Sequence, residues 1–385
     1  MTFKRTMQRI AASLAGAMLF GWGGTAAEDN LYQLTVGKTE LVGQFHGDPV
    51  NADLRLYMAG NQFVVMDLLV EAFKQQYPEY DDIFYVTIPP GKELRWILQG
   101  GVEISAEGSL ADQGFVLRVQ PDVYTTVAKG HMDTLAAEGI ISGYYTYAHN
   151  RLVLMAHAND PLAGTTLAPQ QFYDVMADPG NVISEPDILT QGIERHIWRM
   201  YTATSKVLFP NNQAVQDLDP NMFDPANLPN DPAQSLRRIV YHDKVNDGQT
   251  LLTAIHHLET PANILGGDAR LGPVWGTEID YQRKRLGNQN LAGIEIGGTG
   301  PDGDPLNQSE SVNYLATITE GVMEPDHKRA AAAFVNFLRS PTAQQILQQG
   351  GFIPATQEEL NQPHIYEDND RSRRVGKGQY KEDDD

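Results

Sequence analysis

The most informative segment of the sequence is Pro325-Asp-His-Lys-Arg-Ala-Ala-Ala-Ala-Phe-Val-Asn-Phe-Leu-Arg-Ser-Pro-Thr-Ala-Gln-Gln-Ile-Leu-Gln-Gln-Gly-Gly-Phe-Ile-Pro354. Its pattern predicts two short helices. In the first helix one face is apolar, formed by Ala330, Phe334, Phe337 and Leu338. Ser340 is suited to cap the second helix, Pro341 to occupy its first turn and Gly350-Gly351 to end it. Spacing alone predicts only a helical hairpin.

The other end of the chain reads as a secretory signal. Basic residues at Lys4, Arg5 and Arg9 precede an apolar run over residues 10–22, and Thr25-Ala26-Ala27 supplies small residues. This order predicts a signal peptide over residues 1–27, with cleavage after Ala27. The alternative is an uncleaved anchor, but the run is shorter than the ~20 residues that a membrane span needs. The mature protein is therefore expected not to be membrane-embedded.

Composition narrows the class of protein further. The chain has no cysteine, which excludes a lipid-anchored cysteine, disulfides, thiolate metal sites and a cysteine nucleophile. An export signal without disulfides fits a bacterial periplasm, where a large core makes covalent cross-links unnecessary. The formal net charge of −20 opposes binding to nucleic acid or to an anionic membrane surface.

Alternation of strand and helix patterns predicts a parallel α/β layer. A strand at Leu54–Met58 precedes an apolar helical stripe over residues 62–76, and a strand at Phe84–Ile88 precedes a short helix over residues 93–99. Residues 28–50 are polar and irregular and are interpreted as an N-terminal arm. Further along the chain, a strand is expected over 238–241 and a helix over 247–255. The irregular segments are a loop or hairpin over 100–119, an insertion loop over 208–234, a mobile glycine-rich segment over 294–308 and a disordered charged tail over 364–385.

The string AAAFVNFLRSPTAQQILQQGGFIPA resembles the closing segment of type II periplasmic solute-binding proteins, in particular their molybdate-binding branch. Residues 145–156 are similar to the strand by which the chain of these proteins crosses from the first lobe to the second. Residues 268–272 resemble the segment by which it crosses back. The resemblance covers roughly residues 54–355. It implies an α/β fold of the type II periplasmic-binding-protein kind, with two lobes joined by a hinge and a ligand cleft between them. Lobe 1 is expected from residues 51–148 plus about 277–360, and lobe 2 from residues 149–276.

The resemblance also implies a ligand held against helix N-termini, where unpaired N–H groups and the helix dipole favour an anion. The first expected turn is Gly60-Asn61-Gln62. Asn61 stands where the molybdate pattern has serine, and it is interpreted either as a donor to the ligand or only as a helix cap.

Three further positions complete the expected site. Lys92 departs from the family pattern and either neutralises an anion of more than one charge or, with Glu93, forms an exposed polar start of a helix. Thr190, Gln191 and Gly192 offer donors and close backbone approach at the start of a helix in the second lobe. Trp275 either widens and flattens the pocket or packs in the core.

Other chemistries find little support in the sequence. His256 and His257 are adjacent on an expected helix and cannot share one face. A tyrosine-ligated iron site at residues 144–147 is weighed and not favoured, and residues 297–300 lack the lysine of a phosphate-binding loop. We therefore expect no cofactor, no metal and no enzymatic activity.

The function that these observations favour is periplasmic solute binding. The expected ligand is a small oxyanion such as molybdate or tungstate, delivered by a monomeric protein to the permease of an ABC transporter. The alternative is a periplasmic binding or sensory module of the same fold that serves a signalling or redox partner.

Overall fold

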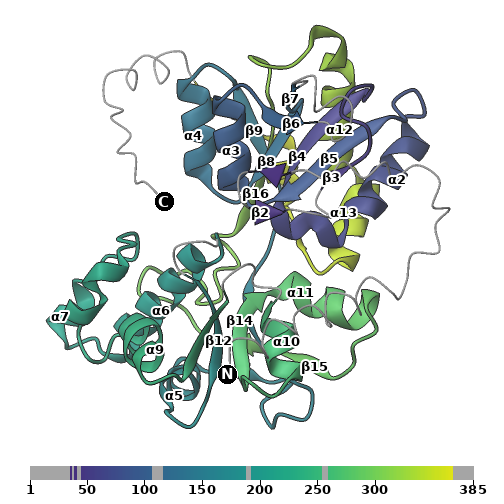
Figure 1. Cartoon of the computed structure of the whole chain (residues 1–385). Helices are drawn as coiled ribbons and strands as arrows, with labels where there is room; N and C mark the ends of the chain where they lie inside the picture. Colours follow the sequence, from purple (N-terminus) through teal and green to yellow (C-terminus); the bar gives the residue numbers. More distant parts are fainter. Residues whose placement is uncertain are drawn as a thin grey trace. The chain divides into compact units, whose positions relative to one another are not determined.

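The computed structural model describes residues 35–36, 39–40, 45–105, 116–187, 192–253 and 259–366 (Figure 1). Leu152–Gln308 form one compact unit, here the second unit, and the described residues on either side of it form the first unit. The chain enters the second unit at Arg151–Leu152 and leaves it at Gln308–Ser309. The predicted signal peptide and most of the predicted arm and tail lie outside the described residues.

The first unit is built on an eight-stranded sheet. Its strands run in the order β17 (Ile353–Pro354), β9 (Gly143–His149), β16 (Asn313–Ile318), β8 (Val123–Thr126), β4 (Leu54–Ala59), β5 (Ile83–Ile88) and β3 (Phe45–His46), and β18 (His364–Ile365) also pairs with β9. Strand β4 is parallel to β5 and β8, and the other pairs are antiparallel. Nearly every residue of β4 is buried, which is typical of a parallel strand that helices cover on both faces.

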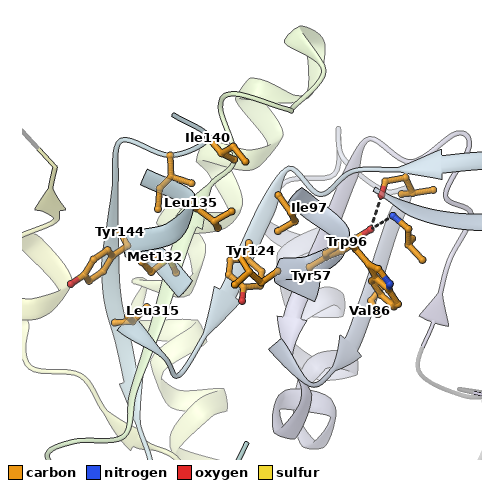
Figure 2. Packing of buried hydrophobic residues seen from close by; sticks show 14 of the residues in the cluster. Tyr57, Val86, Trp96, Ile97, Tyr124, Met132, Leu135, Ile140, Tyr144 and Leu315 are labelled. Atoms are coloured by element: carbon orange, nitrogen blue, oxygen red, sulfur yellow. Dashed lines mark hydrogen bonds between the residues drawn. The ribbon is translucent and has the colours of Figure 1, made fainter. Parts of the chain in front are cut away.

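Helices cover this sheet on both faces (Figure 1). Helices α3 (Pro90–Leu98) and α4 (Lys129–Ala137) lie on one face, and α2 (Met66–Gln76), α12 (Lys328–Leu338) and α13 (Pro341–Gln349) lie on the other. Figure 2 shows the core under α3 and α4, where Trp96 and Ile97 pack against Tyr57 of the sheet. The Tyr57 hydroxyl is satisfied inside this core, because it donates to the Val119 carbonyl at 2.6 Å.

The closing stretch forms the predicted pair of helices, α12 and α13. The rings of Phe334 and Phe337 meet Phe73 of α2 edge-on, with ring centroids 5.2 and 5.6 Å apart. The Ser340 hydroxyl accepts a hydrogen bond from the Ala343 N–H at 3.3 Å, so the predicted cap of the second helix is confirmed.

The second unit contains a six-stranded sheet. Its strands run in the order β11 (Thr166–Leu167), β15 (Leu291–Ile296), β10 (Leu152–His157), β14 (Leu271–Trp275), β12 (Ile183–Pro186) and β13 (Thr250–Thr253). The principal helices are α5 (Pro169–Ala177), α6 (Glu194–Leu208), α10 (Glu259–Leu265) and α11 (Gly276–Asp280). Strands β14, β12 and β13 are parallel, so their carboxyl ends lie along one edge of the sheet.

The chain was predicted to return to the first unit after residue 276, but in the structure it returns at Gln308–Ser309. Strand β15 pairs antiparallel with β10 over five residue pairs, and this pairing keeps residues 277–308 in the second unit. It also replaces part of the glycine-rich segment predicted as mobile with an ordered strand. The apolar alternation of Ala292, Ile294 and Ile296, all buried, was the signal for this strand.

Three further predictions of local structure were wrong. Residues 238–241 were predicted as a strand but lie in a helical run, α8 (Leu236–Arg238), a π-helical turn (Ile239–Asp243) and α9 (Lys244–Asn246). Leu236, Val240 and Lys244 recur at helical spacing and are buried, so packing overrides the strand preference of Ile239 and Val240. Residues 250–253, predicted as helix, form β13. His364–Ile365, predicted as disordered, pair with β9.

The remaining elements fill the connections. Residues 100–119 include the predicted hairpin, β6 (Val102–Ser105) with β7 (Val116–Val119). The predicted insertion contains two short helices, α7 (Gln213–Gln216) and η3 (Pro225–Asn230). The other short elements are β1 (Thr35–Val36), β2 (Thr39–Glu40), η1 (Gly60–Val64), η5 (Tyr281–Arg285), η6 (Pro325–His327) and α14 (Gln357–Asn361). Over the part of the chain that is described, no helix has the length and apolar character of a membrane span.

Candidate ligand-binding turns

In the first unit, two of the predicted turns lie side by side. Strands β4 and β5 are in register to their last residues, Ala59 opposite Ile88. A Cβ atom added to Gly60 would lie 3.0 Å from the carbonyl carbon of Ile88, which is backbone and cannot move aside. Glycine at position 60 therefore permits close contact between the turn after β4 and the turn after β5.

The side chains of Asn61 and Gln62 point into the protein and are not free donors. Asn61 is 7% exposed and its amide nitrogen donates to the Tyr314 hydroxyl. Gln62 is fully buried; its amide nitrogen donates to the Tyr147 hydroxyl, and its oxygen accepts from the Thr125 hydroxyl at 2.8 Å. Asn61 is not a helix cap either, because η1 begins after Ala59 without a side-chain cap.

The same network reaches the end of β9. The amide nitrogen of Asn150 donates to the Tyr314 hydroxyl at 3.2 Å, and its side-chain oxygen accepts from the N–H of Arg151 at 2.9 Å. Asn61, Tyr314 and Asn150 thus link the turn after β4 to the residue at which the chain leaves the first unit. This hydrogen-bond network among the buried side chains of Asn61, Gln62, Tyr147, Tyr314 and Asn150 is called the tyrosine network below.

Lys92 and Glu93 have opposite environments at the start of α3. Lys92 is exposed, whereas Glu93 is fully buried and its carboxylate has no hydrogen-bond partner among the described residues. Burial raises the pKa of Glu93 well above its usual value, by more than the backbone groups of Ile88 and Met58 lower it, and thereby favours the protonated, uncharged form. The interpretation of both residues as an exposed helix start is therefore correct for Lys92 and wrong for Glu93.

In the second unit, the helix that follows β12 begins at Glu194, just after the third predicted turn. Thr190 and Gln191 lie outside the described residues. Gly192 is exposed, and nothing lies within 4 Å of a Cβ atom added there, so the surrounding protein does not require glycine at this position. Trp275, at the carboxyl end of β14, is 4% exposed and packs edge-on against the ring of His196 at 5.5 Å.

Two buried carboxyl groups near the start of α6 were missed by sequence reasoning. Glu185 of β12 accepts from the Tyr201 hydroxyl at 3.0 Å, and burial raises its pKa to about 8. Glu194 has no hydrogen-bond partner among the described residues, and burial with the nearby charge of Glu185 raises its pKa to about 10. Both groups therefore hold a proton at pH 7 and add little negative charge to this edge of the sheet.

His196 is the third buried titratable group here. It is 5% exposed, and burial together with the charges of Arg199 and Arg195 lowers its pKa to about 3. The imidazole is therefore neutral at pH 7. Around the start of α6, Glu185, Glu194 and His196 are therefore uncharged at pH 7, and the charges in this region belong to other side chains.

Those charges include Arg195 and Arg199, one helical turn apart in α6. The guanidinium of Arg199 donates through Nε and Nη2 to the Asn221 side-chain oxygen, at 3.2 and 3.1 Å. Arg195 lies over the ring of Phe223, 5.9 Å from its centroid. Two arginines at helical spacing in a strongly acidic chain were the signal that the sequence offered for them.

Metal ligation has weak support among the described residues. Asp53, Asp81 and Asp82, which are half-buried or exposed, bring ligand atoms within 4.8 Å of one another, and so do Glu324, Asp326 and His327. Arg55 pairs with Glu324 at 2.5 Å, so a fixed cation already balances this group. The tyrosines weighed as iron ligands are engaged elsewhere, Tyr147 with Gln62 and Tyr145 beneath the guanidinium of Arg339.

Comparison with known proteins identifies the family. Residues 54–353 match the family of bacterial extracellular solute-binding proteins. The fold resembles the sulfate-binding protein SubI of Mycobacterium tuberculosis, with a TM-score of 0.51, 13% identity, and coverage of 80% of this chain and 88% of that one.

The periplasmic molybdate-binding protein of Azotobacter vinelandii is also similar, with a TM-score of 0.48, 16% identity, and coverage of 79% and 100%. No curated protein matches this chain in sequence. Since the family match spans most of the described residues of both units, the chain belongs to the bacterial extracellular solute-binding proteins.

Proposed function

We propose that this protein binds a small tetrahedral oxyanion, of the molybdate or tungstate kind, and presents it to the permease of an ABC transporter. The observation that carries the proposal is the family match over residues 54–353, which makes solute binding the activity to be specified. The turns after β4 and β5 lie in contact at the carboxyl ends of two parallel strands, where α/β proteins commonly bind ligands.

The donors that we assign differ from those that the sequence favoured. Because Asn61 and Gln62 are held by tyrosine hydroxyls, they position the turn, and backbone N–H groups near Gly60 and Gly91 are left to contact the anion. Lys92 adds an exposed positive charge beside them. Taken by itself, the second unit offers backbone donors of the same kind at Gly192, just before α6, whereas Trp275 packs in the core.

Titration of the purified protein tests this proposal. Molybdate, tungstate, sulfate and phosphate are added separately, and binding is measured by calorimetry and by thermal unfolding. A true ligand at 100 times its Kd stabilises the folded protein by about 2.7 kcal/mol. Absence of binding to all four anions would refute the oxyanion proposal and leave the family assignment intact.

The cellular part of the proposal has its own test. We propose a monomer in the periplasm whose mature chain begins at Glu28. N-terminal sequencing of the secreted protein, with gel filtration of the same sample, checks both points. A retained Met1 in a membrane fraction would contradict export with cleavage.

A further inference from the structure

Arg195 and Arg199 lie four residues apart in α6, so their side chains leave the same face of the helix with Cβ atoms about 6 Å apart. Neither arginine forms an ion pair with a carboxylate among the described residues. Asn221 holds two nitrogens of Arg199, and the third nitrogen, Nη1, has no partner in the described part of the chain. Arg199 is half-buried, whereas Arg195 is exposed.

Carboxylates in this part of the second unit are occupied elsewhere. Asp219 accepts from the N–H of Asn221 at 2.8 Å, Asp224 accepts from the N–H of Ala226 at 3.0 Å, and Asp231 accepts from Arg237 at 3.0 Å. Like charges one helical turn apart destabilise a helix, and burial with the charge of Arg195 lowers the pKa of Arg199. A chain with a net charge of −20 could balance this pair with its own acids, yet the acid that interacts electrostatically with Arg195 is Glu194, whose pKa of about 10 keeps it uncharged at pH 7.

We propose that Arg195 and Arg199 bind two oxygens of a doubly charged tetrahedral oxyanion, and that Asn221 of the segment over residues 208–234 orients Arg199 for this contact. The inference rests on the proposed function, because it assigns the charge class of the same ligand. Two guanidinium groups match a dianion in charge and offer planar donor pairs to neighbouring oxygens. The inserted segment thereby has a role, since it supplies the only described hydrogen bonds of Arg199.

Tungstate and perrhenate test the charge requirement, because both are tetrahedral oxyanions of similar size and they differ by one unit of charge. Affinity for each anion is measured by calorimetry at constant ionic strength, on the full chain freed of oxyanions. Wild type should prefer tungstate at least tenfold. Arg195→Gln and Arg199→Gln should each weaken tungstate binding about tenfold, since a charge-assisted hydrogen bond contributes that much or more. The double variant should lose most of the preference.

Matched variants separate this role from general electrostatics. Arg283→Gln removes one exposed positive charge from the same unit and should leave both affinities within about twofold. Arg199→Lys keeps the charge but loses the paired donors to Asn221, and Asn221→Ala frees Arg199 without changing any charge. Both should weaken tungstate binding several-fold, with thermal unfolding of the free protein unchanged, so a folding defect in one arginine variant does not decide the outcome.

The outcomes are distinct. If wild type binds neither anion, the proposed function fails together with this inference. If wild type binds tungstate and the double variant keeps both affinity and preference, the inference is overturned while the proposed function stands. An equal loss in Arg283→Gln would also overturn it, because net charge would then explain the effect.

Discussion

The turn after β4 and the start of α6 both bury polar side chains, but they differ in whether those side chains have hydrogen-bond partners. In the tyrosine network, each buried amide of the turn donates to a tyrosine hydroxyl. At the start of α6, Glu194 and the Nδ1 atom of His196 are buried without hydrogen-bond partners among the described residues. A fully hydrogen-bonded network makes this part of the protein rigid. Buried polar groups without partners instead lower the free energy of unfolding. The comparison indicates a rigid turn after β4 and a start of α6 where buried groups lower stability, a cost that buried Glu93 at the start of α3 shares.

Replacing Glu194 with Gln should have the largest effect on this comparison. The folded-state pKa of Glu194, about 10, lies above the unfolded value near 4.5, so its favourable contribution is present below about pH 4.5 and is lost as the pH rises toward 10. Relative to wild type, Glu194→Gln should therefore gain unfolding free energy above pH 5. The gain should grow by at most ~1.4 kcal/mol per pH unit and reach a few kcal/mol at pH 8.

Urea unfolding of both proteins between pH 4 and pH 9 measures this difference. Replacing an exposed aspartate of the same unit, Asp247→Asn, serves as the control and should give a nearly flat difference curve. If Glu194→Gln gives the same flat curve, the carboxyl group is solvated and the contrast between the two regions disappears.

Replacing Gln62 with Leu should disrupt the tyrosine network in the first unit. The leucine has a similar size, but it leaves the hydroxyls of Tyr147 and Thr125 without the partner that they have in wild type. Two buried polar groups deprived of a partner cost about 2–4 kcal/mol of unfolding free energy. Thermal and urea unfolding measure the loss at pH 7.

A double-mutant cycle makes this test specific. Gln62→Leu combined with Tyr147→Phe removes both partners of one hydrogen bond, so the combined loss should be smaller than the sum of the single losses. Additive losses would mean that the two side chains do not interact, and that the turn is held by packing alone.

Lys92→Met should have the smallest effect of the three substitutions. It compares the contribution of an exposed cation to anion binding with that of the half-buried Arg199. Lys92 is exposed, so solvent screening limits its contribution to anion binding to less than about fivefold in Kd. The unfolding midpoint of the free protein should not change measurably. Calorimetry with tungstate decides the point, and a loss larger than that of Arg199→Gln would assign the principal cation to the first unit.

Local sequence patterns were enough to predict the class of fold and much of the order of its elements. The closing stretch predicted α12, α13 and the Ser340 cap, because capping chemistry and the 3.6-residue period act within a few residues of each other. The strands at Leu54 and Phe84 were predicted for the same reason, since their patterns are local. The resemblance of residues 54–355 to the solute-binding family agrees with the family match over residues 54–353.

Contacts between distant parts of the chain determine which side chains of the expected site are free to bind a ligand. Asn61 and Gln62 are separated from Tyr314 and Tyr147 by long stretches of chain, and no local pattern shows that tyrosine hydroxyls take up their amides. The strand predicted at residues 238–241 became helical because Leu236, Val240 and Lys244 pack on one face. The positions of Glu194 and Arg199 likewise depend on β12 and on the 208–234 segment. Burial and partnership are properties of contacts between distant residues, and for that reason the tertiary structure alone defines them.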